Sequence, residues 1–291
     1  MISQEIRHKI RRIKIFTRRI MKETLTGDYH SAFKGSGLEF DQLRDYIYGD
    51  DSRFIDWNSS AKMNKIMIKQ FIEERDRTVI LAIDVSASYL YSSKYELRRD
   101  TLAFLSSTLA FIAHENKDRV GALFFTDRVE KWIAPQRGQT HLGNILETIF
   151  SLNPVGTRTD IAQALKFLVS LKKRNVIIFM ISDWIDDISY YEKILKVASC
   201  KYDFVGFRII DPCERKFPSI GLIDVYNPET RETKTLDARK ALSLNNIFSS
   251  RLYEQKKLFE KYKIDFLDLT VGSPFINSLV QFFHKRIRRQ V

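Results

Sequence analysis

A strand-like apolar run that opens into an acidic, serine-containing loop constrains the fold of this chain more than any other feature. Residues 78–83 (TVILAI) are apolar and rich in β-branched side chains, and Asp84, Ser86 and Ser88 follow at alternate positions. Such a run is typical of a buried strand. In an open α/β sheet, ligands bind at the carboxyl ends of strands, beside a switch in strand order. These side-chain oxygens are therefore predicted to lie at a ligand site, with a purely structural turn as the alternative.

A threonine and a second aspartate stand at comparable points further along the chain. Pro154 and Gly156 mark a loop, and helical spacing of apolar residues begins just after Thr159. A second strand-like run, residues 176–181, is soon followed by Asp183. The chain thus places a threonine at a helix entry and another acid at a strand end.

The residue types of this set predict the kind of metal that it would bind. Side-chain oxygens alone suit a hard cation such as Mg²⁺, with Mn²⁺ and Ca²⁺ as further candidates, rather than zinc or copper. We expect Ser86, Ser88 and Thr159 to bind Mg²⁺ directly, and Asp84 and Asp183 to hold its waters or orient the hydroxyls. Neutral hydroxyl ligands leave the cation electrophilic, so one position would attract a carboxylate from outside.

This set of residues resembles the metal-ion-dependent adhesion site of the von Willebrand factor type A domain. That family carries Asp-x-Ser-x-Ser, a distant Thr and an Asp after a later strand, a pattern that falls here on Asp84, Ser86, Ser88, Thr159 and Asp183. The resemblance implies an α/β, three-layer Rossmann-like fold with a mostly parallel sheet and an antiparallel edge strand. It also implies a protein partner that offers an acidic residue to the ion.

A second resemblance spans nearly the whole chain. Residues 35–40 (GSGLEF), 43–46 (LRDY), 49–57 (GDDSRFIDW) and 71–76 (FIEERD) resemble the N-terminal signature of the bacterial domain of unknown function 58 family. Members carry this signature ahead of a type A-like domain, and the resemblance implies a MoxR-type AAA+ ATPase as partner and a chaperone-like or complex-assembly role. The family often has Met after the second serine; this chain has Tyr89, which we expect to alter access to the site.

Strand-like and helix-like segments alternate along most of the chain, which predicts a mostly parallel sheet between helical layers. We expect an extension over residues 1–77 and a type A-like domain over 78–291. In the extension we expect a helix over 3–25, a short helix over 38–46 and an edge strand over 65–71. In the domain we expect further strands at 119–125, 129–133 (antiparallel), 203–209 and 264–269, a β-like excursion at 222–235, and helices at 95–114, 142–152, 160–172, 189–199, 237–261 and 274–288.

The chain is basic, with a formal net charge of +12, and its positive residues crowd both ends. The N-terminal segment also carries one apolar stripe at helical spacing, Ile6, Ile10, Ile13 and Ile20. We expect this stripe to pack on the protein's own core, with a partner or a membrane surface as the alternative for the basic helix. Nucleic acid is not favoured, because no nucleic-acid-binding module accompanies the charge.

Cysteine content and hydropathy bear on the compartment. The two cysteines, Cys200 and Cys213, form neither a disulfide framework nor a Cys-x-x-Cys motif. No apolar stretch approaches the roughly 18 residues of a membrane-spanning helix, and no apolar segment typical of a signal peptide follows the basic N-terminus. We therefore expect a cytoplasmic protein.

The charged segment Gly49–Trp57 has two interpretations. It could be a polar loop whose charges satisfy one another, with Arg53 bridging carboxylates and Trp57 filling a gap in the packing. It could instead be a partner surface or a support for the metal site. We favour the first interpretation, because buried charges cost free energy unless they are paired.

Motifs of the common nucleotide-binding and hydrolytic enzymes are missing from the sequence. It has no phosphate-binding Gly-x-x-x-x-Gly-Lys loop, no Gly-x-Gly-x-x-Gly fingerprint and no Gly-x-Ser-x-Gly elbow. Ser86 also stands where haloacid-dehalogenase-type phosphatases need a second acid, and a hydroxyl cannot replace a carboxylate in proton transfer. We expect a metal-dependent protein-binding module that is not an enzyme. The alternatives are a metal-dependent phosphoester hydrolase and a type A scaffold without metal.

Overall fold

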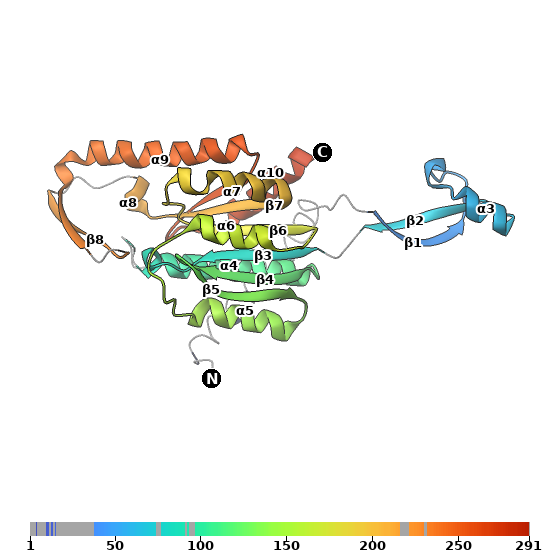
Figure 1. Cartoon of the computed structure of the whole chain (residues 1–291), viewed down its shortest axis with the longest axis horizontal. Coiled ribbons are helices and arrows are strands. Elements are labelled where there is room, and N and C mark those ends of the chain that lie inside the picture. The colour runs from blue at the N-terminus through green and yellow to red at the C-terminus, as the bar shows by residue number, and fades with distance from the viewer. Residues whose placement is uncertain are drawn as a thin grey trace. The chain divides into compact units, whose positions relative to one another are not determined.

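The computed structural model describes residues 4, 10, 11, 13, 15, 38–73, 77–90, 92, 97–215, 221–229 and 232–290. Two compact units make up the chain (Figure 1). Residues 34–77 form the smaller unit, and the larger unit contains 78–291 together with the N-terminal segment.

The larger unit is built on a six-stranded sheet with the strand order β10-β7-β6-β3-β4-β5. Neighbouring strands are parallel except for β5, which runs antiparallel to β4 at one edge. The chain forms β3, β4 and β5 towards one edge and then returns to β6 on the other side of β3, so the strand order switches beside β3. The strands are β3 (Thr78–Asp84), β4 (Arg119–Phe125), β5 (Val129–Gln136), β6 (Val176–Ser182), β7 (Asp203–Ile210) and β10 (Asp265–Thr270).

Helices cover both faces of this sheet (Figure 1). All seven residues of β3 are buried, with Val79 and Leu81 in one core cluster and Ile80 and Ala82 in the other. Continuous apolar strands of this kind are typical of parallel sheets buried on both faces. The first cluster includes residues of α4 (Arg98–Glu115), α5 (Gln139–Ser151) and α10 (Ile276–Gln290), and the second residues of α6 (Ile161–Ser170), α7 (Ile188–Lys201) and α9 (Ala241–Lys261). The expected three-layer, type A-like fold with an antiparallel edge strand is thereby confirmed.

The N-terminal apolar stripe can be followed at two of its four positions. Ile13 is 4% exposed and belongs to the first core cluster, and Ile10 packs against that cluster. This is the expected docking of the segment on the protein's own core. Ile6 and Ile20 lie outside the described residues.

The smaller unit corrects one expectation. Residues 38–46, expected to be a short helix, form instead strand β1 (Leu38–Asp45), which pairs antiparallel with β2 (Met67–Glu73) in a two-stranded sheet. A bulge between Phe40 and Gln42 interrupts the register. Because the extra residue breaks the alternation of apolar positions, the spacing from Phe40 to Leu43 imitates a helical period.

The charged segment of the smaller unit is satisfied partly from outside, since Arg44 and Lys69, which flank it in the sequence, pair with Asp50 and Asp56. Arg44 binds both carboxylate oxygens of Asp50 at 2.7 Å. Arg53 lies in the short helix η2 (Ser52–Phe54) and binds both oxygens of Asp51, the residue that caps this helix. Among the described residues it therefore holds one carboxylate rather than bridging two. Trp57 begins α3 (Trp57–Met63) and is 70% exposed, so the expectation that it fills a gap is wrong.

A β-hairpin leaves the larger unit where an excursion was expected. Strands β8 (Leu222–Asn227) and β9 (Glu232–Asp237) pair with each other in a separate two-stranded sheet, and η4 (Ala238–Lys240) leads from them into α9. Figure 1 shows this hairpin at the end of the main sheet where the parallel strands finish. No helix within the described part of the chain is long and apolar enough to cross a membrane.

Candidate metal site

Asp84 anchors the first loop of the candidate site from the end of β3. Its carboxylate is fully buried, and Oδ1 accepts a hydrogen bond of 3.0 Å from the backbone N–H of Ser86. Oδ2 accepts a hydrogen bond of 2.7 Å from the Ser182 hydroxyl at the end of β6. The hydroxyls of Ser86 and Ser88 lie 3.1 Å apart at the start of η3 (Ala87–Leu90). These contacts aim both serine oxygens to the same side of the loop.

Asp183 follows β6, the neighbour of β3, and is 5% exposed. Its Oδ1 accepts a hydrogen bond from the backbone N–H of Ile185 at 3.2 Å, and Oδ2 pairs with the Arg98 guanidinium at 3.2 Å. The other end of the Arg98 fork binds Glu214 of α8 (Pro212–Arg215). A buried arginine thus compensates part of the negative charge that the carboxylates bring together.

The threonine loop is held against the first loop by backbone contacts. The N–H of Ala87 donates to the carbonyl of Thr157 at 3.0 Å. On the other side, the Glu130 carboxylate accepts hydrogen bonds from the N–H groups of Val155 and Gly156 at 3.0 and 2.7 Å. A side chain at Gly156 would collide with Thr126, because a Cβ there would lie 2.1 Å from its Oγ1. The loop that carries Thr159 can therefore follow this path only with glycine at that position.

Asp160 links this loop to the next helix. Its N–H donates to the carbonyl of Thr126 at 3.1 Å, and its side chain caps α6 by accepting from the N–H of Gln163 at 2.8 Å. An aspartate N-cap of this type satisfies a helix-end donor that would otherwise have no partner. Thr159 thus lies directly before a fixed helix entry, as the sequence predicted.

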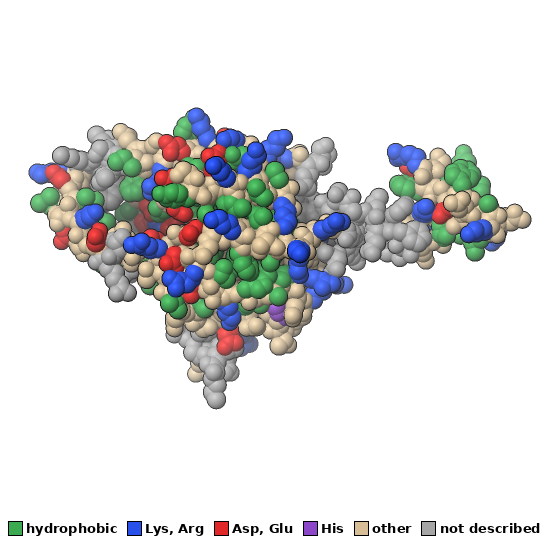
Figure 2. Space-filling model, in the orientation of Figure 1, with side chains coloured by type: hydrophobic (Ala, Val, Ile, Leu, Met, Phe, Trp, Pro, Cys, Tyr) green, Lys and Arg blue, Asp and Glu red, His purple; other side chains and the backbone are tan. Residues whose placement is uncertain are grey.

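The β8–β9 hairpin supplies an acid that the sequence did not single out. The Thr159 hydroxyl donates a hydrogen bond of 3.3 Å to Oε1 of Glu229, which lies between the two strands of the hairpin. The space-filling view shows acidic side chains around the hollow between this hairpin and the body of the larger unit (Figure 2).

Negative charge accumulates at this end of the sheet. Burial, reinforced by the nearby charge of Asp183, raises the pKa of the Asp84 carboxyl to about 7. Burial and the same neighbour also raise the pKa of the Glu229 carboxyl above its usual value. When neighbouring carboxyl groups raise each other's pKa, a cation bound between them stabilises their ionised forms.

The donor set fits a hard cation. In the described ranges, no group of three or more His, Cys, Asp and Glu could hold a metal ion. A metal site at the strand ends would therefore depend on hydroxyl oxygens, and Ser86, Ser88 and Thr159 supply three from two adjoining loops. Oxygen ligands of this type suit Mg²⁺, which keeps several waters and needs few protein ligands.

Tyr89 lies beneath the site rather than at its mouth. Its side chain is 2% exposed and packs in the first core cluster, so the expectation that it alters access is wrong. Among the described atoms, its buried hydroxyl has no hydrogen-bond partner. Asp84, Asp183 and Arg98 all act on it electrostatically, so it lies close to the two carboxylates.

The three predicted loops are therefore neighbours. Hydrogen bonds connect Asp84 to Ser86, and Asp84 to the residue before Asp183, while Ala87 and Thr157 connect the serine loop to the threonine loop. Four contributors to the site were not predicted from the sequence: Ser182, Arg98, Glu130 and Glu229. Of these, Ser182 could have been found from its place beside Asp183, whereas the others come from distant elements.

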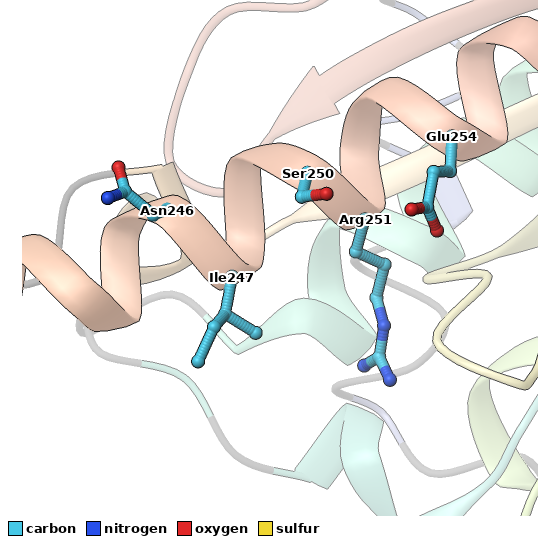
Figure 3. A pocket seen from close by; sticks show the side chains of 5 residues that line it. All are labelled: Asn246, Ile247, Ser250, Arg251 and Glu254. Carbon is cyan, nitrogen blue, oxygen red and sulfur yellow. The ribbon is translucent and has the colours of Figure 1, made fainter.

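A shallow pocket lies elsewhere on the larger unit, along α9 (Figure 3). The residues that line it all come from this one helix: Asn246, Ile247, Ser250, Arg251 and Glu254. Arg251 interacts electrostatically with Asp187, which caps α7. None of the predicted metal ligands lines this pocket.

Comparisons with known proteins find relatives at low sequence identity. The uncharacterized protein Rv1480 of Mycobacterium tuberculosis is 24% identical over 235 residues, which cover 80% of this chain and 74% of that protein. Two solved structures are similar at low identity. The conserved hypothetical protein BatB from Bacteroides thetaiotaomicron has a TM-score of 0.47 at 15% identity, covering 73% of this chain and 99% of its own. The SpRpn10 VWA domain has a TM-score of 0.43 at 13% identity, covering 70% and 93%.

The family assignment rests on the match of a family model to most of the chain. That model, described as "Protein of unknown function DUF58", matches residues 42–257, a range that takes in all three loops of the candidate site. This protein belongs to the DUF58 family.

Proposed function

We propose that this protein is a metal-dependent protein-binding module whose site lies at the carboxyl ends of β3 and β6. The observation that carries the proposal is the meeting of three loops. The Ser86 and Ser88 hydroxyls lie 3.1 Å apart, the adjacent Ala87 is hydrogen-bonded to the Thr159 loop, and Asp84 is tied to the strand that precedes Asp183. The type A-like fold and the DUF58 family support a role as a protein-interaction scaffold, and we propose that a metal ion takes part in that interaction.

The hydroxyls and the carboxylates would have different roles in binding the metal. Ser86, Ser88 and Thr159 would bind Mg²⁺ directly, and Asp84 and Asp183 would hold its waters. Such an ion would supply an attractive position for a carboxylate, because hydroxyl ligands leave its charge largely uncompensated. A glutamate or aspartate of a partner protein would then complete the coordination.

The environment of the carboxylates favours binding over catalysis. Both oxygens of Asp84 accept hydrogen bonds, and Asp183 pairs with Arg98. A general base must reach the proton that it removes from a substrate, whereas binding needs these two carboxylates only to accept hydrogen bonds from metal-bound waters. We therefore do not extend the proposal to the hydrolysis of phosphate esters.

The family resemblance supports a partner class as well. We propose a MoxR-type AAA+ ATPase as partner, in a chaperone-like or complex-assembly role. A pull-down of a MoxR-type ATPase by this protein, with Mg²⁺ and with excess chelator, tests this part. Capture that is lost in chelator supports the proposal; equal capture in both would favour a scaffold that needs no metal.

Titration calorimetry with Mg²⁺ tests the metal assignment itself. We expect saturable binding by the wild-type protein and a loss of affinity of at least about tenfold in Ser86→Ala and Thr159→Ala, because each loses a direct ligand. Ser170→Ala is the control, since its exposed hydroxyl in α6 lies outside the site. Wild-type affinity in both site variants would show that the assignment is wrong.

A further inference from the structure

The strongest unassigned feature is the contact between Thr159 and Glu229. These residues are 70 positions apart, and the Thr159 hydroxyl donates to Glu229 Oε1 at 3.3 Å. The backbone of Glu229 is itself held in the turn, because its N–H donates to the Asn227 side chain at 3.0 Å. A predicted metal ligand is thus already in contact with a carboxylate from the same chain.

Within the part of the hairpin that the structure describes, the strand pairing stays inside the hairpin. Its strands pair with each other and not with the main sheet, and Leu222 and Tyr226 are 69% and 41% exposed. At its base, the N–H of Ala238 donates to the carbonyl of Gly221 at 2.7 Å. Glu229 is only partly exposed, so the carboxylate reaches inward while much of the hairpin faces solvent.

The charges around Glu229 make its position costly in the absence of a cation. Asp183 and Asp186 both act on its carboxylate with like charge, and Arg158 is the positive neighbour. Like charges at close range repel, and a divalent ion between them reverses the sign of the interaction. A cation at this place would therefore add to the Thr159 hydrogen bond and the Arg158 charge, which already favour the ionised form of Glu229.

We propose that Glu229 is a ligand of the metal site supplied in cis, and that the β8–β9 hairpin closes the position that a partner's acid would take. This inference rests on the proposed function, since it needs the metal site at Ser86, Ser88 and Thr159. The hairpin would be held down when the metal is bound. A partner carboxylate would have to displace Glu229, so the closed hairpin would lower the affinity for the partner.

Amide hydrogen exchange of the full chain, with and without Mg²⁺, tests the closure without any assay of activity. We expect Mg²⁺ to slow exchange in residues 222–237 of the wild-type protein by about tenfold, because a fixed hairpin opens less often. In Glu229→Gln the same residues should show no Mg²⁺-dependent change. Glu232→Gln is the matched control, since it makes the same charge change on the same hairpin at an exposed side chain, and it should behave as wild type.

Mg²⁺ affinity, measured by calorimetry on the same variants, separates the two proposals. We expect Glu229→Gln to bind Mg²⁺ about tenfold more weakly than wild type, because the site loses one charged ligand. Loss of Mg²⁺ binding in Thr159→Ala, with binding by wild type, supports the metal site. If Glu229→Gln then keeps full Mg²⁺ affinity, and Mg²⁺ does not change hydrogen exchange in wild type, the assignment of Glu229 as a ligand is wrong although the metal site stands. If wild type binds no Mg²⁺, both proposals fall.

Discussion

The Ser182 hydroxyl donates a hydrogen bond of 2.7 Å to the buried Asp84 carboxylate and so ties the end of β6 to the end of β3. The same hydroxyl accepts a hydrogen bond from the N–H of Trp184 at 3.1 Å. The Ser182 side chain thereby positions both acids of the candidate site. It contacts Asp84 directly, and it fixes the backbone on the far side of Asp183 through Trp184.

Replacing Ser182 with alanine should destabilise the protein. The change leaves Oδ2 of Asp84 without the donor that it has in the wild-type fold, and a buried acceptor left unsatisfied costs about 1–3 kcal/mol. Urea unfolding of Ser182→Ala measures this loss. Ser170→Ala, which removes an exposed hydroxyl, should change the free energy of unfolding by less than about 0.5 kcal/mol. Equal effects of the two substitutions would contradict the structural role of Ser182.

The raised pKa of Asp84 predicts a pH dependence of stability without metal. The folded-state pKa of about 7 lies above the usual aspartate value of 3.8, so between these two pH values the folded state holds a proton that the unfolded state has released. The bound proton on Asp84 therefore stabilises the folded state, fully so below the unfolded-state pKa. This stabilisation is lost as the pH rises through about 7. In chelator, the free energy of unfolding should fall between pH 5 and pH 8, and Asp84→Asn should flatten that fall.

Mg²⁺ should reverse part of this dependence. A cation at the site favours the charged form of Asp84, so Mg²⁺ should stabilise the wild-type protein more at pH 8 than at pH 5. Thermal unfolding at the two pH values, with Mg²⁺ and with chelator, measures the difference. A Mg²⁺ effect that is the same at both pH values would show that the ion does not act near Asp84.

Removing Arg98 should make the protein depend on the metal. Arg98 is 6% exposed and pairs with Asp183 and Glu214, and breaking one side of a buried ion pair costs about 3–5 kcal/mol. Arg98→Met should therefore be strongly destabilised in chelator. Mg²⁺ should restore part of the loss, because it would supply positive charge beside Asp183. Urea unfolding in both conditions tests this, and the same loss with and without Mg²⁺ would count against a cation site there.

A methyl group at Gly156 should disrupt the threonine loop. Its Cβ would lie 2.1 Å from Oγ1 of Thr126 and 2.3 Å from Oδ1 of Asp127, so the loop would have to move. We expect Gly156→Ala to lower both stability and Mg²⁺ affinity. Gly143→Ala is the matched control: a Cβ there meets no atom within 4 Å, and alanine in the middle of α5 should be neutral or stabilising by up to about 1 kcal/mol. Calorimetry and thermal unfolding of both variants test this difference.

The sequence predicts the parts of the fold that depend on local pattern. The β3 and β6 runs are apolar throughout, and each is followed by an acid, so the strand ends and their position beside the switch in strand order could be inferred. The prediction failed at β1, where a bulge next to Phe40 hides the alternation that identifies a strand. It failed also at Trp57, because local sequence does not determine whether an aromatic side chain at a helix start is covered.

The rest of the candidate site depends on contacts between distant elements. Arg98 begins a helix and Glu130 lies on the antiparallel edge strand, and neither belongs to a motif that would mark it. Glu229 reaches Thr159 only because the hairpin folds back to the end of the sheet where the parallel strands finish (Figure 1). These contacts arise when distant elements pack together, and the local spacing of residues in a sequence does not indicate them.

Diffraction from a crystal of the full chain grown with Mn²⁺, recorded at the manganese absorption edge, shows whether the three hydroxyls hold a metal ion. We expect one anomalous peak bounded by the hydroxyl oxygens of Ser86, Ser88 and Thr159, with Asp84 and Asp183 beside it. A well-ordered site with no peak, or a peak held by other residues, would contradict this expectation.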